Sequence, residues 1–191
     1  MVSHLIPNPI TRLLTRKGYG VQSPYAYHIV RHIIGEQAPY YAYATLRKRF
    51  GQRSDEPLLR LLLRLSNALQ PRTCTLLPSA GQEGKGDSNH KEEEALVAYL
   101  RAGCRQMNLL TPAAPPFPPS DLIVSTTTPA LQALNDNALN NGGCILLRRT
   151  RGDRRTWTDI LHHPSATLVF DCRTHALIFR KDNMAGARYH L

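Results

Sequence analysis

The sequence predicts an α/β protein, with a mostly parallel sheet covered by helices on both faces and preceded by N-terminal helices. The first seventy residues are rich in leucine, and their apolar residues recur at helical spacing. After them, short and uniformly apolar runs alternate with helical segments, which is typical of a parallel sheet buried on both faces. Two apolar runs near the end lie close enough in sequence to pair as a hairpin, so one antiparallel strand is expected.

Residues 1–70 are predicted to be helical and to pack on the sheet. Ser23 followed by Pro24 predicts a helix start, because serine caps helix N-termini and proline fits the first turn. Tyr40 to Phe50 predicts a short helix with a basic end. A leucine-rich helix follows near Pro57, and because it leaves only a narrow polar stripe, most of its sides are expected to be buried. The stripe consists of Arg60, Arg64 and Asn67.

Residues 71–191 are predicted to form the α/β domain, in one structural unit with the N-terminal helices. Strands are expected at residues 73–77, 106–110, 122–125, 144–147, 166–170 and 176–179. Helices are expected from Asn89 to Gly103, from Thr128 to the glycines at 142 and 143, and around Trp157. Residues 111–120 contain five prolines and are expected to be an extended connector.

The 191-residue chain has a net charge of +10, and the positive excess is concentrated at its two ends. Residues 1–66 hold ten basic and three acidic residues, and residues 147–191 hold nine and four. Such ends can attract nucleic acid, anionic lipid or an acidic protein, although a solvated surface rich in arginine is the simpler explanation.

The sequence also predicts where the protein is located. No stretch reaches the ~18 apolar residues of a membrane span, and the first seven residues lack the apolar run of a secretory signal. The four cysteines are far apart and form no CxxC pair, which fits neither a disulfide framework nor a zinc site. We therefore expect a cytoplasmic protein with no membrane partner and no bound metal.

Two segments carry a resemblance to a known family. Residues 17–27, Lys-Gly-Tyr-Gly-Val-Gln-Ser-Pro-Tyr-Ala-Tyr, resemble the His-Ser-Pro-Phe-containing N-terminal segment of a group of bacterial class I S-adenosylmethionine-dependent methyltransferases. The tail from Trp157 through Asp171 to Lys181 resembles the closing segment of the same group. The resemblance implies a Rossmann-like methyltransferase sheet, and methyl transfer from S-adenosylmethionine to an oxygen or nitrogen of a small molecule or macromolecule.

The cofactor motifs of that family are incomplete in the middle of the chain. The stretch from Leu77 to Gly86, which follows the first strand, has glycines but not the family's Glu-x-Gly-x-x-x-Gly pattern. The second strand ends at Leu110 without the carboxylate that holds the ribose hydroxyls in the family. The proline connector then stands where the family has another helix and strand. The resemblance therefore predicts a divergent member with a degenerate cofactor site.

If S-adenosylmethionine still binds, the resemblance places Gly81, Gly84 and Gly86 against its methionine or adenosine part. Ser79 or Ser125 would then supply hydrogen bonds. The same glycine-rich stretch also has the composition of a surface connector. No catalytic residue is identified, but methyl transfer can depend mainly on proximity and alignment.

Arginines are expected at the carboxyl end of the fourth strand, the edge where ligands bind in open α/β sheets. Arg148, Arg149 and Arg151 are candidate anion-binding residues, and they stand where some relatives carry a pair of aspartates. An arginine cannot ligate a cation, so metal-dependent transfer is not expected from these positions. Ion-paired or solvated surface arginines are the ordinary alternative.

A second basic cluster, Arg47-Lys48-Arg49 with Arg53, follows the tyrosines Tyr40, Tyr41 and Tyr43, a composition suited to stacking on unpaired bases. Three functions therefore remain open. The first is a methyltransferase, and the second is a non-catalytic descendant that binds nucleic acid or an acidic protein. The third is a protein-binding scaffold, with a homodimer formed through the N-terminal helices.

Overall fold

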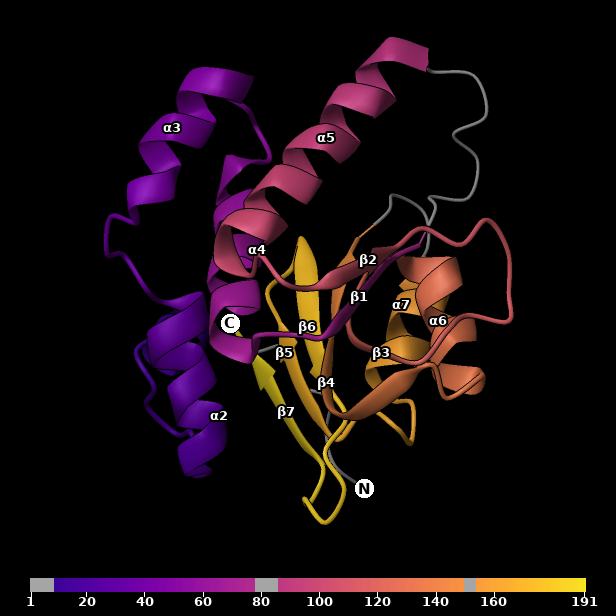
Figure 1. The fold of residues 1–191 in the computed structure, drawn as a ribbon. Helices are drawn as coiled ribbons and strands as arrows, with labels where there is room; N and C mark the ends of the chain where they lie inside the picture. Colours follow the sequence, from indigo (N-terminus) through magenta and orange to yellow (C-terminus); the bar gives the residue numbers. More distant parts are fainter. Residues whose placement is uncertain (1–8, 78–85, 150–153) are drawn as a thin grey trace.

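A seven-stranded sheet lies at the centre of the molecule, in the strand order β2-β1-β3-β4-β6-β5-β7 (Figure 1). The structure is a computed structural model, and it describes residues 9–77, 86–149 and 154–191. β6 runs antiparallel to its neighbours β4 and β5, whereas the other strand pairs are parallel. The strands are β1 (Thr73–Leu76), β2 (Asn108–Leu110), β3 (Ser120–Thr126), β4 (Leu139–Arg148), β5 (Leu168–Asp171), β6 (His175–Phe179) and β7 (Ala187–His190).

Helices cover both faces of this sheet. The helices are α1 (Pro9–Arg16), α2 (Pro24–His28), α3 (Tyr41–Phe50), α4 (Glu56–Leu69), α5 (Gly86–Gly103), α6 (Thr127–Asn135) and α7 (Arg154–Leu161), with a π-helix, η1 (Ile29–Ile34), after α2. Alternate residues of β4 show the two layers, because Leu146 packs with α4 and α5, and Leu147 packs with α6 and α7. The predicted Rossmann-like sheet, mostly parallel with a C-terminal antiparallel hairpin, is confirmed.

The helix α2 begins as the sequence predicts. The Ser23 side chain accepts a hydrogen bond from the backbone N–H of Ala26 at 3.3 Å, and Pro24 occupies the first turn of α2. The chain continues as the π-helix η1, whose buried residues belong to the same hydrophobic cluster as residues of α4, α5 and the sheet. Arg64 of α4 holds the end of η1 by donating hydrogen bonds to three carbonyl oxygens. These belong to Ile33 (2.7 Å), Glu36 (3.1 Å) and Ile34 (3.3 Å).

The helices α4 and α5 approach each other closely at Gly103. A Cβ at this position would collide with the Ser66 hydroxyl and with the carbonyl oxygen of Leu63. The buried Ser66 hydroxyl lies within hydrogen-bonding distance of the carbonyl oxygens of Leu63 (3.1 Å) and Leu100 (3.0 Å). Gly103 is therefore required as the smallest residue at the crossing, and it also ends α5 as predicted.

Asp121 ties three strands together at the amino end of the sheet. Its carboxylate accepts hydrogen bonds from the backbone N–H groups of Arg72 (2.9 Å) and Thr73 (3.1 Å), and from the Asn140 amide (2.8 Å). Burial raises the pKa of Asp121, but these hydrogen bonds outweigh burial, so the pKa lies below its usual value.

Several predicted boundaries are wrong. The helix expected to start at Asn89 begins at Gly86, and the helix expected to start at Thr128 begins at Thr127 and ends at Asn135. Gly142 and the glycine after it do not terminate that helix but lie inside β4, which begins with a bulge against β3. Gly142 has a φ of +82°, a conformation that glycine adopts without strain.

The strand β7 was not predicted. Its sequence, Ala-Arg-Tyr-His, has no apolar run, and it pairs with β5 at the edge of the sheet. The Tyr189 ring stacks on Phe170 with centroids 5.5 Å apart, and Ala187 also packs against the core, whereas Arg188 and His190 are polar. None of the helices in the described ranges combines the length and apolar character needed to cross a membrane.

Candidate functional site

The carboxyl ends of the parallel strands β1, β3 and β4 meet at one edge of the sheet, at Leu76, Thr126 and Arg148 respectively. The strand order reverses at β1, because the chain passes through α5 to β2 on one side and then crosses to β3 on the other. Open α/β sheets bind their ligands beyond the carboxyl ends at such a point. The candidate site is therefore sought at this edge.

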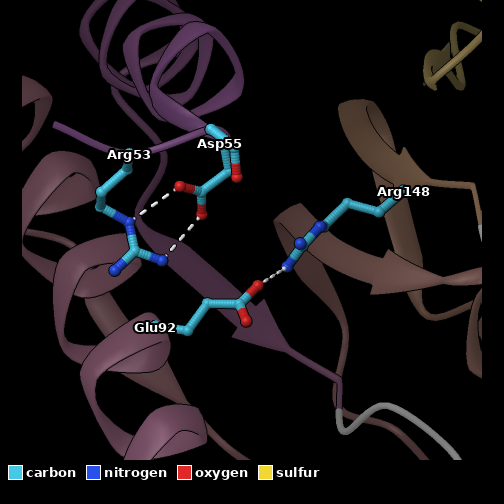
Figure 2. Close-up of a pocket in the computed structure, with 5 residues that line it drawn as sticks. Arg53, Asp55, Glu92 and Arg148 are labelled. Carbon is cyan, nitrogen blue, oxygen red and sulfur yellow. Dashed lines mark hydrogen bonds and ion pairs between the residues drawn. The ribbon is translucent and has the colours of Figure 1, made fainter.

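A polar hollow of about 300 Å³ opens at this edge, between the sheet and the helices of one face (Figure 2). Its lining comes from three parts of the chain. Arg53, Ser54 and Asp55 belong to the turn before α4, Glu92 belongs to α5, and Arg148 ends β4. The volume is at the lower end of the range of small-molecule sites. The hollow thus combines two guanidinium groups with two carboxylates.

The first ion pair of the hollow is held by two hydrogen bonds. The Arg53 guanidinium donates from Nε to Asp55 Oδ1 at 2.8 Å and from Nη2 to Oδ2 at 3.0 Å. Burial raises the pKa of Asp55, but the hydrogen bonds and charge of Arg53, with a contribution from the charge of Arg148, bring it below its usual value. Asp55 is therefore ionised at neutral pH, and its two-pronged contact fixes the direction of the Arg53 fork.

The second ion pair is more open. Arg148 Nη1 lies 2.6 Å from Glu92 Oε1, and each side chain keeps 33% of its surface exposed. The close-up shows the Glu92 carboxylate lying between the Arg53 and Arg148 guanidinium groups (Figure 2). The pKa of Arg53 is raised mainly by its hydrogen bonds to Asp55, and the charge of Glu92 raises it further. The four charges therefore alternate in sign across the hollow.

Local geometry explains why these side chains meet. Along β4, Arg148 shares a face with Leu146, which packs against α4 and α5. Along α5, Glu92 stands three and seven residues before the buried Ala95 and Tyr99, so it lies on the helix face that covers the sheet. Strand alternation and helix periodicity thus bring Glu92 over the end of β4.

Of the five predicted cofactor residues, only Gly86 and Ser125 fall within the described residues. Ser79, Gly81 and Gly84 lie outside the described residues. Gly86 is the first residue of α5, and Ser125 is buried in β3, where its hydroxyl donates to the carbonyl oxygen of Thr126 at 2.8 Å. Ser125 is not among the residues that line the hollow. A role of these five residues in cofactor binding stays a prediction.

The structure separates the predicted anion-binding arginines. Arg148 enters the hollow, whereas the Arg149 guanidinium lies over the Trp157 ring, 5.3 Å from its centroid, and donates to the carbonyl oxygen of Arg173. Because Trp157 belongs to the core on the α6–α7 side, Arg148 and Arg149 point to opposite faces of the sheet. Arg151 lies outside the described residues. A joint contribution of the three to one anion site stays a prediction.

Four of the five residues that line the hollow were not predicted as residues of this site. Arg53 was assigned to the basic cluster that follows the tyrosines, and Ser54 was given no role. Asp55 was interpreted as the start of a helix, and Glu92 as the partner of Asn89 at another helix start. The fourteen acidic residues of the chain offer no local pattern that distinguishes these two. Asp55 and Glu92 lie close together because α5 crosses the sheet beside the turn that precedes α4. Such a contact between distant segments cannot be predicted from the spacing of residues in the sequence.

The tyrosine-rich basic segment is only partly available for stacking. The Tyr40 and Tyr43 rings pack against each other with centroids 5.3 Å apart, and Tyr43 is covered by Arg60. Tyr41 is fully exposed, and Arg47 and its neighbour Lys48 are exposed on α3. The proposed stacking surface therefore has one free ring in this segment instead of three.

The described residues do not fit S-adenosylmethionine in the position that the family resemblance implies. The strands β1, β2 and β3 end in leucine, leucine and threonine, so no strand end among them carries a carboxylate for the ribose hydroxyls. Asp55 and Glu92 are each held by an arginine. In the part of the chain that the structure describes, no group of three or more His, Cys, Asp or Glu could hold a metal ion.

No protein-family model and no curated protein matches this chain. Among solved structures, the chain is similar to the SAH-bound methyltransferase PaMTH1 of Podospora anserina, at 12% sequence identity and a TM-score of 0.46. The match covers 95% of this chain and 100% of that chain. A likeness at this score establishes neither the family nor the activity, so the fold assignment depends on the strand order and directions given above.

Proposed function

We propose that the chain is a methyltransferase-fold protein with a degenerate cofactor site, which acts by binding a ligand or partner and does not transfer methyl groups. The observation that carries the proposal is the Arg148–Glu92 ion pair across the carboxyl edge of the sheet. By the family resemblance, an aspartate pair stands at the position of Arg148 and Arg149 in some relatives. An arginine only donates hydrogen bonds, so it cannot replace an acceptor there.

The edge of the sheet beside β1 supports the same proposal. β2 is a strand of three residues at the edge of the sheet, and the proline connector follows it directly. By the resemblance, the family continues there with a further helix and strand that complete the nucleoside half of the site. Without them, an adenosine lacks one wall of its site, and β2 itself ends at Leu110 without the acid that would hold the ribose.

The test is a binding measurement with S-adenosylmethionine and S-adenosylhomocysteine on the full chain, by calorimetry and by thermal unfolding. A ligand with a Kd of 10 µM would stabilise the protein by about 2.7 kcal/mol at 1 mM. For a chain of this size, that corresponds to a rise in Tm of roughly 5–10 °C. We expect a shift below about 1 °C and no measurable heat. A Kd in the micromolar range for either compound contradicts the proposal.

Nucleic-acid binding is a second candidate function, and the exposed end of α3 favours it. Arg47 and Lys48 are exposed there, on the helix that carries the fully exposed Tyr41. Binding to phosphates should weaken steeply with salt, because cations are released from the nucleic acid. Replacing Arg47 and Lys48 by glutamine should therefore reduce both the affinity and its salt dependence in a gel-shift assay. As a control, replacing the exposed Arg101 and Arg105 by glutamine removes the same charge from another part of the surface. An equal loss of affinity in this control would exclude the end of α3 as a specific binding surface.

A further inference from the structure

The Glu92 carboxylate occupies a position that a bound anion would take. It lies between the guanidinium groups of Arg53 and Arg148 in the hollow at the carboxyl edge (Figure 2). We propose that this hollow is an anion-binding site, that Glu92 stands in for the ligand when the site is empty, and that the ligand carries a phosphate group. The inference deepens the proposed binding function and rests on it.

One side of the site is built in advance. Asp55 engages two N–H donors of Arg53 and fixes the plane of its guanidinium. A guanidinium has five N–H donors, so others on the same fork remain for a ligand. Ser54, between these two residues in the sequence, also lines the hollow. The resulting arrangement resembles the forks that bind phosphates elsewhere, where the arginine is held in position before the anion arrives.

The other side of the site can open. Glu92 holds Arg148 through one oxygen–nitrogen contact, and both side chains are one-third exposed. Exposed pairs of this kind contribute a factor of about five or less to an equilibrium. Rotation of the Glu92 side chain toward solvent would free the Arg148 donors without moving either backbone. Two facing guanidinium groups would then be left with one fixed counterion, Asp55.

A ligand must displace Glu92 from the two arginines, and this requirement indicates how much charge the ligand carries. Glu92 is tethered beside the arginines, and a tethered group acts at an effective concentration of about millimolar or more. A ligand with a single carboxylate would gain little by replacing it. A phosphate carries a charge of about −1.5 to −2 at neutral pH and several acceptor oxygens, so it can contact both guanidinium groups at once. This difference favours phosphate over carboxylate ligands.

The test is calorimetry of the full chain with inorganic phosphate and with adenosine 5′-monophosphate, at constant ionic strength. Glu92→Gln removes the competing charge, and we expect it to tighten binding of both probes by about fivefold. Arg148→Met should weaken binding at least tenfold. Glu93→Gln is the matched control, because it makes the same charge change on the next, exposed residue of α5 and should alter the affinity less than twofold.

The outcomes are separable. Equal tightening by Glu92→Gln and Glu93→Gln would show a general charge effect and overturn the inference, as would unchanged affinity in Arg148→Met. No binding to wild type or Glu92→Gln at about 10 mM probe overturns it as well. If Arg148→Met fails to fold, Arg148→Lys replaces it, because lysine keeps the charge and loses the fork, and unchanged affinity then overturns the inference.

The two probes distinguish the source of the phosphate group. Nucleotide binding at least tenfold tighter than phosphate, with the same response to Glu92→Gln, supports a nucleotide ligand. Equal affinities support a free phosphate or another small phosphate ester. The S-adenosylmethionine titration is separate. Binding there contradicts the proposed loss of the cofactor site, whereas absence of phosphate binding contradicts the anion site alone.

Discussion

Arg64 offers the sharpest stability prediction, because one side chain holds the end of a whole helix. Its guanidinium donates to the carbonyl oxygens of Ile33, Ile34 and Glu36 at the end of η1. The last carbonyls of a helix have no partner within the helix, and a positive charge near them is also favourable. Arg64→Met keeps the apolar stem and removes all three hydrogen bonds.

The size of the effect follows from the number of bonds. A hydrogen bond of this kind contributes about 1 kcal/mol, so the loss of three predicts a decrease of about 2–3 kcal/mol in the free energy of unfolding. Arg60, one turn earlier in the same polar stripe, is the matched control. It pairs with Glu56 four residues away and lies over the Tyr43 ring, 4.8 Å from its centroid. Those contacts predict a loss of about 1 kcal/mol for Arg60→Met.

Urea unfolding, followed by far-ultraviolet circular dichroism, measures both variants. With a slope of about 2 kcal/mol per molar urea, Arg64→Met should lower the midpoint by roughly 1–1.5 M. Arg64→Lys should recover only part of the loss, because one ammonium group cannot reach three carbonyl oxygens. If Arg64→Met costs no more than Arg60→Met, the capping role assigned to Arg64 is refuted.

Three further predictions concern the core and the amino end of the sheet. Gly103→Ala should lower the free energy of unfolding by about 1–3 kcal/mol, measured in urea. Adding Ser66→Ala should not restore the stability, because the Leu63 carbonyl oxygen still obstructs the new Cβ. No loss of stability in Gly103→Ala would contradict the close helix crossing. The pKa of Asp121 is lower in the folded protein, so its carboxylate stabilises the fold above about pH 4, and this stability is lost as the pH falls through the folded pKa. In Asp121→Asn, the free energy of unfolding should therefore fall less steeply as the pH is lowered below about 4. An unchanged pH dependence would contradict the role of the Asp121 hydrogen bonds. Burial raises the pKa of Cys74 to about 12, and all four cysteines are buried, so a thiol reagent at pH 8 should modify the native protein slowly and the unfolded chain rapidly at four sites.

Local sequence signals predicted most elements of the fold because each signal acts within a few residues. Ser23 and Pro24 start a helix wherever they precede an apolar face, and the leucines of α4 leave only one polar stripe. The boundaries of α6 and β4 were less predictable. Gly142 can end a helix or form a bulge, and pairing with β3 selects the bulge.

The candidate site was predictable only at its one strand-end residue. Arg148 was expected there because it follows a buried apolar run, and such runs end at the ligand-binding edge of a parallel sheet. Its neighbour Arg149 was expected at the same site, but strand alternation sends it to Trp157 on the opposite face. Glu92 and Asp55 carried no comparable signal, because their roles depend on contacts between separate helices.

The sequence by itself determined the alternation of strands and helices, the closing hairpin and the departure from the cofactor motifs of the family that the chain resembles. Each of these depends on the order of residue types along a short stretch. Only the tertiary structure decided which charges face one another, because that depends on how α5 crosses the sheet beside the turn before α4. The alternating charges of the hollow arise from this packing, since Asp55, Glu92 and Arg148 belong to segments that meet only when the sheet is assembled.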